Sequence, residues 1–95
     1  CTFGTSGQAI FGYGSTGSHS SLTNLVSNTG VVASDVTGVG TARSAVGAAS
    51  YGGDKGIFGY GNTATNLTNK VSNSGVVASD TTGVGTARAE LGATG

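Results

Sequence analysis

The stretch IFGYG at residues 10–14 decides the fold, because it returns unchanged at residues 57–61. Downstream of it, residues 22–50 align without a gap to residues 67–95, and 21 of these 29 positions are identical. The spacing shortens from 47 to 45 residues because the loop between the two matches is two residues longer in the first copy. A length difference that leaves both flanks aligned marks a surface loop. A period of 45–47 residues is typical of propellers and solenoid arrays.

The composition is that of a polar, glycine-rich chain. Gly, Thr, Ser and Asn contribute 19, 14, 12 and 6 of the 95 residues, which is just over half. Such a composition is common in disordered linkers. The hydrophobic content of 36%, which includes ten valines, and the repeat itself indicate a folded chain instead.

Charge and residue types exclude several classes of protein. Four basic and four acidic residues give a net charge of zero, too little to neutralise the phosphates of a nucleic acid. No run approaches the roughly 20 apolar residues of a membrane-spanning helix. Because the chain holds a single Cys and a single His, it has no internal disulfide and no His/Cys metal cluster. We therefore expect no cofactor, no nucleic-acid partner and no membrane span.

Each repeat contains four short strand-like runs separated by Gly, Asn and Asp. In the second copy these are residues 47–51, 55–61, 67–73 and 75–79. A helix over residues 41–50 is disfavoured, because that segment has an internal glycine and no apolar stripe. Four short strands at this period predict one blade of a β-propeller.

The order of features also resembles the kelch-type repeat of β-propellers. Arg43 precedes a small apolar strand, residues 55–61 look like the glycine-ended second strand, and residues 74–77 look like the turn and last strand. The resemblance implies an all-β propeller of four-stranded blades, with two blades in this chain. The first repeat would span residues 1–42 and the second residues 43–87.

Two blades cannot close a ring, since propellers have about four to eight. We expect a homo-oligomer, with a trimer of six blades favoured over a tetramer of eight. Residues 88–95 repeat the start of a blade and would supply a first strand to a neighbouring protomer. The amino-acid sequence of the repeat is also similar to tandem repeats in environmental, largely marine viral, proteins. That similarity implies a structural or adhesive protein of a virion or extracellular surface.

Two groups of residues are candidates for function. Tyr13 and Tyr60 end the second strand of each repeat, where a tyrosine can stack on a sugar or simply pack between blades. The adjoining variable loops contribute His19, Asn62 and Asn66 as candidate ligand contacts.

An aspartate and an arginine eight residues apart recur in both copies. Asp35 and Arg43 return as Asp80 and Arg88. Since they belong to the shared repeat, we interpret them as structural pairs, with an arginine that forks onto a carboxylate or carbonyl oxygens. No residue is assigned a catalytic or metal-binding role.

The sequence thus favours a non-enzymatic scaffold module that assembles into a closed propeller and binds a carbohydrate or a surface. One alternative is that the chain belongs to a longer tandem-repeat structural or adhesion protein from a phage or microbe. Another is a propeller-type enzyme whose site forms between protomers.

Overall fold

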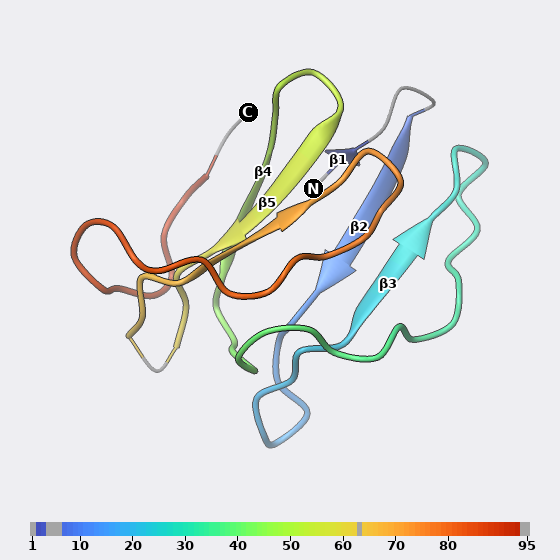
Figure 1. The fold of residues 1–95 in the computed structure, drawn as a ribbon. Coiled ribbons are helices and arrows are strands. Elements are labelled where there is room, and N and C mark those ends of the chain that lie inside the picture. Colours follow the sequence, from blue (N-terminus) through green and yellow to red (C-terminus); the bar gives the residue numbers. More distant parts are fainter. Residues whose placement is uncertain (1, 4–6, 63, 94–95) are drawn as a thin grey trace.

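A computed structural model describes residues 2–3, 7–62 and 64–93 (Figure 1). These residues form strands, turns and loops and no helix, so the all-β prediction is confirmed. No described segment is a helix that could cross a membrane. The six strands are β1 (Thr2–Phe3), β2 (Gln8–Gly12), β3 (Thr23–Val26), β4 (Gly47–Tyr51), β5 (Lys55–Gly59) and β6 (Thr68–Val71).

The strands form two open antiparallel sheets, ordered β1-β2-β3 and β4-β5-β6. The repeated sequence produces the same register twice. Gly12 faces Thr23 across β2 and β3, and Gly59 faces Thr68 across β5 and β6. The segment 41–50, for which a helix was disfavoured, forms no helix and ends within β4, the edge strand of its sheet.

The fourth run of each repeat lies along the sheet edge but forms isolated bridges instead of a continuous strand. Val77 bridges to Val71 and Thr81 bridges to Thr68, so three residues of the outer segment face two of β6. One extra residue in the outer segment is a β-bulge, which interrupts the ladder. The first copy has the same interruption between its bridges Val26–Val32 and Thr23–Val36.

The hydrophobic core lies between the two sheets. It consists of Ile10 from β2, Phe58 from β5, Val71 from β6 and Val77 from the outer segment. A Cβ atom added to Gly12 would lie 2.8 Å from Cζ of Phe58, so only glycine lets β2 approach that ring. The sheets are therefore held face to face by side chains that neither sheet could bury alone.

The predicted extra first strand concerns residues 88–95. Residues 88–93 lie beside the start of the second repeat. The backbone N–H of Glu90 donates to the carbonyl oxygen of Ala45 at 3.0 Å. No strand forms among the described residues of this segment. Its role as a strand of a neighbouring protomer remains a prediction, and residues 94–95 lie outside the described part.

Candidate functional site

The centre of the molecule holds a charged side chain, Arg43, which is only 1% exposed. Its guanidinium group reaches from the segment that joins the two sheets into the second sheet. Nη1 donates to the carbonyl oxygens of Tyr60 (3.3 Å) and Leu67 (2.9 Å), and Nη2 donates to Oδ1 of Asn69. Nε donates to the carbonyl oxygen of Thr41 at 3.1 Å. A buried cation is tolerated only when its donors are satisfied in this way.

Asn69 and Asp80 extend the network on the second sheet. Asn69 is fully buried, and its Nδ2 donates to Oδ1 of Asp80 at 2.9 Å and to the carbonyl oxygen of Ala78 at 3.1 Å. The hydroxyl of Thr41 in the first repeat donates to Oδ2 of Asp80 at 2.7 Å, and its backbone N–H lies 3.2 Å from both carboxylate oxygens. Asp80 lies within the bulge of the outer segment, between the bridges of Val77 and Thr81.

The pKa of Asp80 reflects these contacts. Desolvation raises this pKa, but hydrogen bonds from Asn69 and Thr41, with the charge of Arg43, outweigh it and hold the pKa below its usual value. No buried side-chain nitrogen or oxygen in the described part of the chain lacks a hydrogen-bond partner. The junction is thus a completed polar network.

Tyr13 closes the network on the side of the first sheet. Its ring lies 4.6 Å from the guanidinium carbon of Arg43 and 5.3 Å from the ring of Phe58. Its hydroxyl donates to the carbonyl oxygen of Val39 at 2.8 Å, and burial raises its pKa. Tyr13 has a φ of 65°, an uncommon backbone conformation for a non-glycine residue. The backbone conformation and the packing together fix this ring in the junction.

Each part of this network has a counterpart in the other copy of the repeat, where the arginine and the aspartate are exposed. Arg88 lies 4.6 Å from the ring of Tyr60, whose hydroxyl donates to the carbonyl oxygen of Val84. Tyr60 has a φ of 63°, almost the same as Tyr13. At the other end of the molecule, Nδ2 of Asn24 donates to Oδ1 of Asp35 at 2.8 Å. Arg88 and Asp35 are both exposed.

The aspartates and arginines predicted to pair within each copy are paired differently. Arg43 reaches Asn69 in the second sheet, while Asp35 accepts from Asn24 in the first sheet. The physical reason is the stacking of the sheets, which places Arg43 over the second sheet. In the described residues the ion pair is Lys55–Asp54, at 2.9 Å in the turn between β4 and β5.

The candidate loop residues lie apart from this network. His19 is exposed and bridges Ser15 within its loop. The backbone of Asn62 pairs with that of Ser44, and Nδ2 of Asn66 donates to the carbonyl oxygen of Gly85 at 2.9 Å. The hydroxyls of both candidate tyrosines already donate to backbone carbonyl oxygens, and an arginine lies against each ring. The structure therefore does not gather the predicted sugar contacts into one site.

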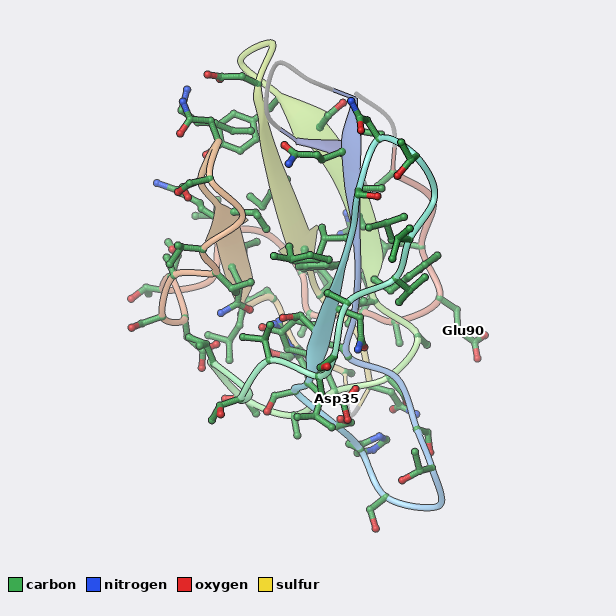
Figure 2. The ribbon with its side chains drawn as sticks, turned by 90° about the vertical axis from the view of Figure 1, so that its right-hand side faces the viewer. Asp35 and Glu90 are labelled. Carbon is green, nitrogen blue, oxygen red and sulfur yellow. The ribbon has the colours of Figure 1, made fainter. Side chains whose placement is uncertain are left out.

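The acidic residues do not form a catalytic or metal-binding group. Figure 2 shows Asp35 beside the strands of the first sheet, whereas Glu90 projects outward from the C-terminal segment. No group of three or more His, Cys, Asp or Glu side chains occurs in the part of the chain that the structure describes.

Sequence reasoning missed Asn69 and Phe58, the residues that receive the first repeat. A signal was available for Asn69, since it recurs as Asn24, and in both copies a Thr precedes it and a Val follows two residues later. Phe58 also recurs, as Phe11, but nothing in the sequence distinguishes the buried copy from the exposed one. The chain matches no protein-family model and no curated protein.

Proposed function

We propose that the chain is a non-enzymatic scaffold module built from stacking repeats, which assembles with copies of itself into a closed propeller. The observation that supports this is the junction around Arg43. Its arginine is buried and donates through all three guanidinium nitrogens, and most residues of the junction occur in both repeats. A junction whose parts recur is one that can be formed again with a further repeat. The arginine acts as the link between successive units.

The proposal includes the size of the assembly. Two sheets per chain favour three copies, which would give six blades and a mass of about 27 kDa, three times 9.0 kDa. Contacts of this head-to-tail kind are heterologous, so they close into a ring only if the rotation per copy closes, and otherwise form a filament.

Size-exclusion chromatography with light scattering, followed by electron microscopy, tests this function. We expect a discrete species of about three chains and ring-shaped particles. Filaments would favour the open tandem array. A species of 9.0 kDa at every concentration up to about 1 mM would reject self-assembly as the function.

A glycan contact remains a secondary proposal that rests on the loop residues His19, Asn62 and Asn66. The first-copy loop around His19 is exposed and carries the hydroxyls of Ser15, Thr16 and Ser18. Hydroxyl and amide groups are suitable partners for sugar hydroxyls. A glycan array probed with the assembled protein tests this proposal, and the absence of binding to any sugar would remove it without affecting the scaffold function.

A further inference from the structure

The two copies of the repeat differ sharply in burial on one face of each sheet. Phe58 of the second copy is 2% exposed, whereas its counterpart Phe11 is 64% exposed. Val77 is 8% exposed and its counterpart Val32 is 55% exposed. We call this the phenylalanine face; it carries Phe58, Asn69, Val77 and Asp80 in the second copy and Phe11, Asn24, Val32 and Asp35 in the first.

The opposite face shows the reverse asymmetry. Arg43 is buried and Val39 is half-buried in the first copy, whereas the counterparts Arg88 and Val84 are exposed, Val84 to 82%. We call this the arginine face. It carries Ile10, Gly12, Tyr13, Val39, Thr41 and Arg43 in the first copy and Ile57, Gly59, Tyr60, Val84, Thr86 and Arg88 in the second. Inside the molecule, the arginine face of the first sheet covers the phenylalanine face of the second.

The exposed arginine face contains an open apolar socket. A cavity of about 180 Å³ is lined by residues that include Ile57, Gly59, Tyr60 and Leu91. At the internal junction, Phe58 packs against the corresponding first-copy surface, which includes Ile10, Gly12, Tyr13 and Val46. The socket therefore has the shape and chemistry that an aromatic ring fills elsewhere in the same molecule.

The exposed phenylalanine face carries a matching aromatic side chain, Phe11, and the matching hydrogen-bonding groups. Phe11 lines a cavity of about 260 Å³ together with Tyr13, Leu22, Asn24 and Asp35. The counterparts of the last four residues in the second copy are Tyr60, Leu67, Asn69 and Asp80, which hold Arg43 and Thr41 by hydrogen bonds. Asn24 already holds Asp35 in the orientation that Asn69 gives Asp80, since both amides also donate to the matching carbonyl oxygens of Ala33 and Ala78.

We propose that a second copy of this chain docks head to tail between these two faces, with Phe11 of one copy in the 180 Å³ socket of the other and Arg88 of that other copy on Asn24 and Asp35. Thr86 takes the place of Thr41 on the carboxylate of Asp35. The inference deepens the proposed scaffold function, on which it rests, by assigning the contact surface residue by residue.

The substitutions between the copies fit this docking. On the arginine face and around the socket, the positions that differ include Leu25, replaced by Lys70, and Val46, replaced by Leu91. Leu91 keeps the socket apolar. Lys70 is exposed on β6, and its long aliphatic stem can lie against apolar surface while the ammonium group reaches water. The residues that make the hydrogen bonds of the junction are identical in the two copies.

A pair of one-face variants tests the docking. Phe11→Asp blocks the phenylalanine face and leaves the arginine face intact, and Arg88→Asp does the opposite. We expect each variant alone to remain a single chain in light scattering, with its dissociation constant raised by about 30-fold or more. An equimolar mixture forms a capped dimer of about 18 kDa, twice 9.0 kDa, through the two intact faces. This dimer also demonstrates that both variants fold.

Val31→Asp is the matched control, because Val31 and its counterpart Val76 are both 65% exposed and so lie outside the internal junction. This variant assembles like the wild type. If the one-face variants assemble like the wild type, or their mixture yields no dimer, the docking is wrong while the scaffold function stands. A wild-type chain that never assembles would overturn both.

Discussion

At the scale of single residues, Arg43 shows how this chain buries a charge. Its hydrogen-bond partners are the neutral oxygens of Thr41, Tyr60, Leu67 and Asn69, and its planar group also lies against the ring of Tyr13. Lysine could not reproduce this, since it lacks the planar fork of donors. Asp80 acts on this arginine through Asn69 and through its charge.

Replacing Arg43 by alanine should destabilise the fold strongly. The oxygens of Leu67 and Asn69 would lose a charged donor in a buried site, at a cost of about 3 kcal/mol in the free energy of unfolding. Arg88→Ala is the matched control and should change it by less than about 0.5 kcal/mol in the single chain, because Arg88 is exposed. Urea unfolding followed by circular dichroism measures both; equal losses in the two variants would contradict the assignment.

The lowered pKa of Asp80 predicts a loss of stability in acid. Because the folded-state pKa lies below the unfolded value of about 3.9, the contribution of this carboxylate is fully present at higher pH. It disappears as the pH falls below about 4 and through the folded-state pKa. Urea midpoints measured between about pH 2 and pH 7 should therefore decline less steeply in Asp80→Asn than in the wild type. Parallel pH curves for the two proteins would disprove the role of Asp80.

At the scale of secondary structure, strand β2 owes its position to Gly12. The strand must approach the ring of Phe58 more closely than any side chain would permit. Its counterpart Gly59 in β5 faces the open socket, where the nearest atom to an added Cβ is Cγ2 of Thr68 at 3.2 Å. The repeated glycine therefore lies against an aromatic ring in the first sheet and borders an unfilled cavity in the second.

Replacing each of these two glycines by alanine should affect different properties: the stability of the single chain at Gly12 and its assembly at Gly59. Gly12→Ala forces its methyl group against Phe58 and should cost about 1–3 kcal/mol of stability. Gly59→Ala should cost less than about 1 kcal/mol in the single chain but narrow the socket and weaken docking. Thermal unfolding and light scattering provide the two readouts. A Gly59→Ala variant that unfolds as readily as Gly12→Ala would count against this difference.

At the scale of the whole molecule, the two sheets share one core instead of possessing one each. Ile10 comes from the first sheet, while Phe58, Val71 and Val77 come from the second. Neither three-stranded sheet has a hydrophobic interior of its own, and such small sheets need packing against another layer. The two repeats should therefore unfold together.

Truncation of Phe58 tests this shared core. Phe58→Ala should cost about 3–5 kcal/mol, enough to unfold much of a small domain, and both sheets should be lost in one transition. Phe11→Ala should leave the stability of the single chain nearly unchanged, because the ring is 64% exposed. Amide hydrogen exchange reports on each sheet separately. Protection that survives in one sheet of the Phe58→Ala protein would refute a shared core.

Much of the fold could be predicted from the repeat. Residues 47–51 form a strand as expected, and the strands near residues 55–61 and 67–73 are shorter by a few residues. The fourth run forms only bridges, because the extra residue of its bulge interrupts the ladder. Among the candidate residues, Arg43 and Asp80 belong to one network. The sequence could not show that Arg43 lies near Asp80 and not near Asp35, since the Asp–Arg spacing is the same within each copy.

The sequence by itself determined that the chain is all-β and twofold repetitive, because strand periodicity and turn residues are local properties that recur with the repeat. Only the tertiary structure decided which copy of each residue is buried. Burial depends on what lies opposite a side chain, and identical residues such as Phe11 and Phe58, or Arg88 and Arg43, meet solvent in one copy and protein in the other. That difference, which no sequence pattern records, is what leaves one arginine face and one phenylalanine face open.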